Sequence, residues 1–200
     1  MKKIFLMCAS VLLMASCAHT SGNASADNAT VGDSIASTAN TVADLSKLSD
    51  EQVAKSAQDS LTAIYAKVFA WYNDPANAGE KTPDFESLYM SADYLKLYKE
   101  VVTLDDKHPD MVGFFDADHW VCGQDYQNLS MKIVSGSRVG ENGYKAELVI
   151  SNCGSDTPLA VSMIFENGEW KIDDFLSGDK CADSEKIAMQ SYVASNSESK

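Results

Sequence analysis

The densest cluster of polar side chains lies between residues 116 and 125, in the stretch Asp-Ala-Asp-His-Trp-Val-Cys-Gly-Gln-Asp. Carboxylate and imidazole groups at this density can bind a cation or a polar ligand, and an indole ring can stack on a ligand. We therefore predict a ligand-binding site at the mouth of a cavity. Its candidate residues are Asp116, Asp118, His119, Trp120, Gln124 and Asp125. The alternative is a solvated loop whose Asp side chains cap neighbouring backbone amides.

The cluster matches no familiar metal or catalytic pattern. Oxygen ligands suit calcium, but the glycine and terminal glutamate of an EF-hand loop are missing. Zinc would use His119 and Cys122, yet no second pair at ligand spacing is present. His119 beside Asp118 could act as a general base, but neighbouring residues of a strand point to opposite faces. No nucleophile elbow, P-loop or dinucleotide fingerprint occurs, so we predict no catalytic residue, no metal site and no cofactor.

An isomerase-like site would need a buried aspartate with a raised pKa that meets a tyrosine. Four tyrosines lie at helical spacing, which is typical of core positions: Tyr65, Tyr72, Tyr94 and Tyr98. Near the end of the last predicted strand, alternation from Trp170 places Asp174 on the inner face beside Ile172. The alternative is that Asp174 lies at the solvent-exposed end of the strand, where a neighbouring amide donates a hydrogen bond to its carboxylate.

Composition sets outer bounds on the class of protein. The chain has 200 residues and a formal charge of −13, with 45% hydrophobic and 22% charged residues. These fractions are ordinary for a globular protein and exclude wholesale disorder. The acidity makes nucleic acid an unsuitable partner, because binding phosphates requires a face rich in Lys and Arg.

The N-terminal segment has the features of a targeting signal. Lys2 and Lys3 precede an apolar run over residues 4–14 that is too short to span a bilayer. With Ala15-Ser16 before Cys17, the segment resembles a bacterial lipoprotein signal, in which Cys17 is lipidated and becomes the first residue. The resemblance implies a signal peptide over 1–16 and a membrane anchor on Cys17. It also implies a place in the bacterial cell envelope, which we expect to be the outer membrane facing the periplasm.

The rest of the chain divides into a spacer and one domain. Residues 17–47 are rich in Ala, Ser, Thr and Asn and contain no aromatic residue, so we predict a lipidated flexible tether. Two of the 16 basic residues precede Cys17 and all 29 acidic residues follow it, so the chain from Cys17 onward carries a charge of −15. A single domain is expected over 48–195.

Helices are predicted first in this domain and strands afterwards. A capping box at Ser49-Asp50-Glu51-Gln52 starts a long amphipathic helix that ends at Asn73, and two short helices follow, broken around Ser91. From about Met131 the apolar period becomes two, and Asn-Gly pairs mark hairpins at 140–143 and 166–169. Helical character returns over 184–193. This order predicts an α+β fold with N-terminal helices packed on a curved antiparallel sheet.

The order of elements resembles the nuclear-transport-factor-2-like, or cystatin-like, superfamily, and within it the uncharacterised bacterial lipoproteins. The Gln124-Asp125 step before the strands and the closing Trp170-Lys171-Ile172-Asp173 strand carry the resemblance, which covers roughly 50–178. It implies a cone-shaped cavity between sheet and helices. Enzymes, binding proteins and interaction modules all use this fold, so the resemblance does not choose a function.

Three of the five cysteines fall in the domain, namely Cys122, Cys153 and Cys181. Beyond the inner membrane thiols oxidise, and the expected strand order brings all three to one edge of the sheet. Any two could pair, and we favour Cys122–Cys153 because their strands should be neighbours.

Together these features favour a non-catalytic envelope lipoprotein that binds a small ligand or an envelope protein. One alternative is an immunity or inhibitor protein whose acidic face covers a basic toxin. Another is an isomerase- or hydrolase-like enzyme that uses the same cavity.

Overall fold

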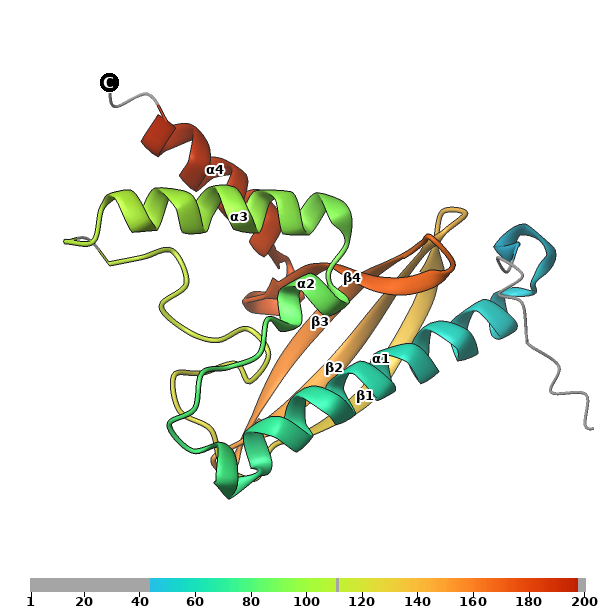
Figure 1. Cartoon of the computed structure of the whole chain (residues 1–200). Helices are drawn as coiled ribbons and strands as arrows, with labels where there is room; N and C mark the ends of the chain where they lie inside the picture. The colour runs from blue at the N-terminus through green and yellow to red at the C-terminus, as the bar shows by residue number, and fades with distance from the viewer. Residues whose placement is uncertain (1–43, 111, 198–200) are drawn as a thin grey trace, which may run out of the picture. The chain divides into compact units, whose positions relative to one another are not determined.

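The computed structural model describes residues 44–110 and 112–197, and Cys17, the signal segment and most of the expected tether lie outside them. The described residues form an α+β fold with four α-helices and an open, five-stranded antiparallel sheet (Figure 1). None of the helices in these two ranges combines the length and apolar character that crossing a membrane requires.

The first long helix, α1 (Asp50–Asn73), begins where the capping box predicts it. The Ser49 Oγ accepts a hydrogen bond from the Gln52 N–H at 3.2 Å, and the Gln52 Oε1 accepts one from the Ser49 N–H at 2.9 Å. A short 3₁₀ turn, η2 (Pro75–Asn77), follows α1. The predicted apolar stripe is the buried face of the helix: Val53, Ala57, Leu61, Ile64, Tyr65, Val68, Phe69 and Tyr72.

The folded part begins upstream of the expected boundary at residue 48. Leu45–Lys47 form a short 3₁₀ helix, η1, capped by the side chain of Asp44. Leu45 is only 6% exposed, and its carbonyl accepts a hydrogen bond from the Arg138 guanidinium. The end of the expected tether therefore packs on the domain through one buried leucine. The composition of the segment does not reveal this tertiary contact.

Two further helices flank the predicted break at Ser91. The short α2 (Phe85–Tyr89) is capped by Asp84 and α3 (Ala92–Lys107) by Ser91, and each capping side chain accepts a hydrogen bond from a backbone N–H of the first turn. With 16 residues α3 is not one of the two short helices expected, and its buried positions are Tyr94 and Val101.

The sheet is a meander in which each strand pairs with the next along the chain. Its strands are β1 (Ser130–Val139), β2 (Gly143–Asn152), β3 (Ser155–Glu166), β4 (Glu169–Ser177) and the two-residue β5 (Asp183–Ser184). Both predicted hairpins are present. The β3–β4 turn has Asn167 at φ 53° and Gly168 at φ 86°, as the Asn-Gly pair predicts, whereas the β1–β2 turn places the positive φ, 65°, on Gly140.

The final helix, α4 (Glu185–Ser197), packs against α3 (Figure 1). Asp174 holds its start, because the carboxylate accepts a hydrogen bond from the Lys186 N–H at 3.0 Å and another from the Ser184 hydroxyl. Asp174 is buried, at 9% exposed, and burial raises its pKa, but strict alternation from Trp170 does not place it on the inner face. The register between β3 and β4 shifts by one residue at Asp173, so Phe175 takes the next inward position.

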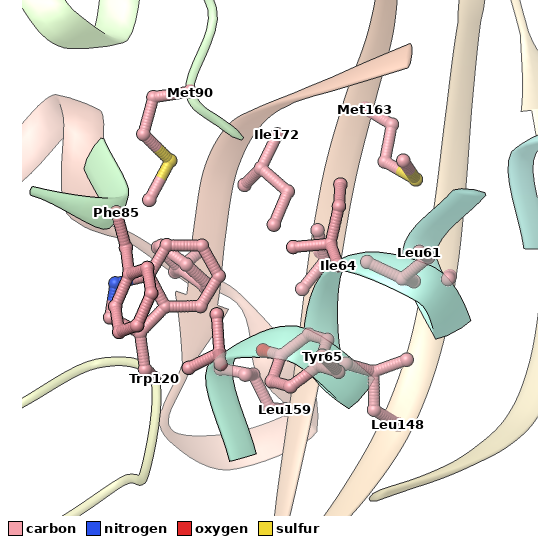
Figure 2. Close-up of a cluster of buried hydrophobic side chains, with 14 of the residues drawn as sticks. Leu61, Ile64, Tyr65, Phe85, Met90, Trp120, Leu148, Leu159, Met163 and Ile172 are labelled. Carbon is pink, nitrogen blue, oxygen red and sulfur yellow. The ribbon is translucent and has the colours of Figure 1, made fainter. Parts of the chain in front are cut away.

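The core lies between α1 and the inner face of the sheet. Figure 2 shows Leu61, Ile64 and Tyr65 of α1 meeting side chains from the strands. Burying each such leucine or isoleucine contributes roughly 1.5–3 kcal/mol to stability. The side chains labelled there on the other elements are Phe85, Met90, Trp120, Leu148, Leu159, Met163 and Ile172. The space between α1 and the sheet is therefore packed with side chains.

Candidate functional site

The polar cluster forms a loop between α3 and β1 rather than a strand. Its middle closes on itself through paired hydrogen bonds between the backbones of Asp118 and Gly123, at 3.0 and 3.3 Å. The Asp118 carboxylate accepts a hydrogen bond from the Trp120 N–H at 2.7 Å and another from the Tyr72 hydroxyl. The aspartate thus caps backbone, as the solvated-loop alternative expects. The strand argument that separated Asp118 from His119 does not apply, because this segment is not extended.

A cavity of about 960 Å³ opens beside this loop. Four of the six candidate residues line it, namely Asp116, Asp118, His119 and Gln124. The other walls come from segment 81–87 and from one face of α3, with Tyr72 of α1. No strand residue lines this cavity, so it does not lie between sheet and helices as the family resemblance implies.

Trp120 and Asp125 lie away from the cavity lining. Trp120 is 1% exposed and belongs to the core (Figure 2). Its Nε1–H donates to the Glu86 Oε1 at 3.0 Å. It therefore orients a cavity residue instead of forming a stacking wall. Asp125 is exposed, and its carbonyl accepts a hydrogen bond from the Asn152 side chain at 2.8 Å.

His119 is held between two glutamates from separate helices. Its Nδ1 lies 3.2 Å from the Oε1 of Glu185 in α4, and its Nε2 lies 3.4 Å from the Oε1 of Glu86 in α2. The second contact is a charge contact without hydrogen-bond geometry. The imidazole is 9% exposed and stacks on the Phe175 ring, with centroids 4.4 Å apart. One loop residue thus ties α2 to α4.

The two carboxylates decide the charge of this histidine. Burial acts to lower the pKa of His119, but the nearby carboxylates of Glu185 and Glu86 outweigh burial and raise the pKa to about 9. For Glu86 burial acts to raise the pKa, while the nearby His119 imidazole and the hydrogen bond from the Trp120 indole prevail and lower it. At neutral pH His119 is therefore an imidazolium, which has no lone pair to accept a proton.

An aromatic wall faces the charged groups. The rings of Tyr98 and Phe115 lie 5.1 Å apart and line the cavity. Burial, with the charges of Glu86 and other carboxylates, raises the pKa of Tyr98 to about 12. Two lysines also line the cavity, Lys81 and Lys99. Counting His119 as charged, three cations face four carboxylates in this lining, so its net charge is small.

Sequence reasoning missed the residues that the fold brings in from other segments. Glu86 and Glu185 both contact His119, although they lie far from it along the chain. Each stands near the start of a helix, where an acidic residue is usual, so position alone gives no functional signal. Only the packing of α2 and α4 around the loop assembles the group.

The three domain cysteines are free thiols, so the expected Cys122–Cys153 bridge is not formed in this structure. The Cys122 thiol is largely buried beside the carbonyl of His119, whereas Cys153 is exposed in the β2–β3 turn. The two turns nevertheless meet at Asn152, whose side chain donates to the Val121 carbonyl at 3.0 Å. Within residues 44–110 and 112–197, no three His, Cys, Asp or Glu side chains are arranged to hold a metal ion.

Comparisons with known proteins find little. No protein-family model and no curated protein matches the chain. Among solved structures, one similar chain is a phospholipid-binding protein from Ralstonia solanacearum in complex with a phospholipid. It is 12% identical, the match covers 74% of this chain and 87% of that one, and the TM-score is 0.31.

Proposed function

We propose that this chain is a non-catalytic binding module of the bacterial cell envelope that holds a small ligand beside the loop between α3 and β1. The observation that carries the proposal is the cavity of about 960 Å³, whose walls combine aromatic rings with carboxylates, lysines and hydroxyls. Ligand sites in proteins typically enclose roughly 300–1,000 Å³ and pair an apolar wall with a few polar groups that orient the ligand.

The protonation states of two reactive groups support binding rather than catalysis. A general base must be unprotonated near the working pH, whereas the pKa of His119 is raised to about 9. A cysteine nucleophile must be a thiolate, whereas burial, with smaller effects of Asp118 and Glu185, raises the pKa of Cys122 to about 11. Both groups are therefore poorly suited to start a reaction at neutral pH.

The envelope part of the proposal is supported by the first 17 residues. Lys2, Lys3, the short apolar run and Cys17 are typical of a lipoprotein signal. Several acyl chains on Cys17 would anchor the protein stably, since each buried methylene contributes about 0.8 kcal/mol. The full chain should partition into the detergent phase of a Triton X-114 extract and a Cys17→Ser variant into the aqueous phase. Equal partitioning of both would contradict the anchor.

We also retain membership of the nuclear-transport-factor-2-like superfamily as a proposal. An antiparallel meander with a long N-terminal helix on its inner face supports it. The filled space between α1 and the sheet is a departure from the cone-shaped cavity of that architecture, so a site in the loop and α3 region would be a variation on it.

Ligand binding can be tested by thermal shift of the full-length Cys17→Ser protein against a panel of small metabolites and sugars. We expect at least one compound to raise the melting temperature. Leu95→Trp, which places an indole inside the cavity, should abolish that shift. Leu88→Trp is the matched control, because Leu88 is 53% exposed and lies outside the cavity lining. A shift that survives Leu95→Trp would place the ligand elsewhere, and no shift with any compound would contradict the proposal.

A further inference from the structure

A second cavity, of about 420 Å³, lies at the C-terminal end of α1. Its walls come from residues 72–78 and from residues 126–129 before β1. Tyr72 lines both this cavity and the larger one. The two spaces are therefore neighbours separated by one tyrosine side chain.

Tyr72 is fixed in this dividing position from both sides. Its hydroxyl donates to the Asp118 carboxylate, on the side of the first cavity. Its ring meets the edge of the Tyr126 ring on the other side, with centroids 4.8 Å apart. Tyr126 is 38% exposed, so part of its side chain is open to solvent where it lines the second cavity.

The second cavity is polar but nearly uncharged. Its one carboxylate, Asp74, is occupied in capping η2, where it accepts a hydrogen bond from the Ala76 N–H at 2.9 Å. The side chains of Gln127 and Asn128 add amides that both donate and accept. Among the residues that the structure describes, no lysine, arginine or histidine lines this cavity. A phosphate or carboxylate ligand would find no cation there, although such groups usually need one.

The first cavity has the same character on a larger scale. Its cations and carboxylates nearly balance, and Thr82, Ser87 and Thr103 contribute hydroxyls. A lining that both donates and accepts hydrogen bonds beside aromatic rings suits a ligand with many hydroxyls and apolar C–H faces. A strongly charged ligand of either sign would meet like charge in the same cavity.

We infer that the two cavities form one extended site and that its ligand is a neutral oligosaccharide, which crosses Tyr72 and stacks a sugar on Tyr126. The inference rests on the proposed function of the first cavity and adds the ligand class and a second subsite. When one oligosaccharide occupies both subsites, its second contact is intramolecular. The affinity should therefore rise with the length of the oligosaccharide.

Isothermal titration calorimetry of the full-length Cys17→Ser protein tests this with four probes: the disaccharide and the hexasaccharide of β-1,4-linked N-acetylglucosamine and of α-1,4-linked glucose. We expect one hexasaccharide to bind at least about tenfold more tightly than its disaccharide. Tyr126→Ala should remove most of that gain, about tenfold. Tyr126→Phe keeps the ring and should keep the gain.

The other outcomes separate this inference from the proposal on which it rests. If all four sugars fail while a charged metabolite binds and Leu95→Trp blocks it, the oligosaccharide is wrong and the binding module stands. Equal affinities for hexasaccharide and disaccharide, or a Tyr126→Ala variant with unchanged affinity for both, would overturn the second subsite. If neither sugars nor metabolites bind, both proposals fail.

Discussion

The Nδ1 of His119 lies 3.2 Å from the Oε1 of Glu185, so a loop side chain and the first residue of α4 form an ion pair inside the fold. The Tyr94 hydroxyl of α3 donates to the same oxygen. Glu86 of α2 completes the group on the other side of the imidazole. Four segments of the chain thus converge on one buried charge, and two of these residues, His119 and Glu86, line the cavity.

This charge makes the stability of the protein depend on pH. The pKa of His119 is about 9 in the folded chain, above the ordinary value of 6.5. Protonation therefore favours the folded state: its contribution is fully present below pH 6.5 and is lost as pH rises through 9. We expect the free energy of unfolding in urea to fall by on the order of 3 kcal/mol between pH 6 and pH 9.5.

The control is His119→Gln, which should be less stable at pH 6 and should lose most of this pH dependence. The pKa of Cys122 is also raised, to about 11, so that thiol adds to the decline above the ordinary cysteine pKa of about 8.5. The contribution of the histidine is therefore the difference between the two proteins. An equally steep decline in His119→Gln would show that other groups are responsible.

The core predicts a second effect. Leu61 is fully buried between α1 and the sheet (Figure 2), so Leu61→Ala removes transfer free energy and leaves a void. We expect a loss of about 3 kcal/mol in the free energy of unfolding. Val134→Ala, at a position that is 59% exposed, should change it by less than about 0.5 kcal/mol. Similar midpoints for the two variants in urea would contradict this packing.

The capping box of α1 predicts a smaller effect. Ser49→Ala removes the acceptor for the Gln52 N–H, which should cost about 1 kcal/mol of stability. Ser49→Asp keeps an acceptor at the same place and should remain close to the original protein. Thermal unfolding followed by circular dichroism compares the two. No loss in Ser49→Ala would show that the cap contributes nothing, and equal losses in both variants would show that the loss does not come from the missing acceptor.

The free cysteines should differ in reactivity. The thiolate is the reactive form, and burial raises the pKa of Cys122 to about 11, whereas Cys153 is exposed. In the native protein iodoacetamide should therefore modify Cys153 well before Cys122, as peptide mass analysis over time will show. Recovery of Cys153 in a disulfide with Cys122 would contradict this prediction and would support the bridge expected from the sequence.

Local patterns predicted the elements well because local physics determines them. The capping box set the start of α1, and the Asn167-Gly168 pair marked a hairpin, since Asn and Gly tolerate a positive φ. The prediction failed where one residue changes a long-range register. The bulge at Asp173 moves the residues that follow it in β4 to the opposite face of the sheet, and the sequence of β4 gives no sign of this shift.

For the site, the sequence by itself determined that polar side chains cluster over residues 116–125. Four of the six candidate residues predicted from this cluster line the cavity. Only the tertiary structure decided which of these side chains are buried and which charged groups they contact. It buried Trp120 in the core and brought Glu86 and Glu185 to His119. Spacing along a chain reports which groups share a turn or a face, whereas burial and pairing depend on segments that meet only when the chain folds.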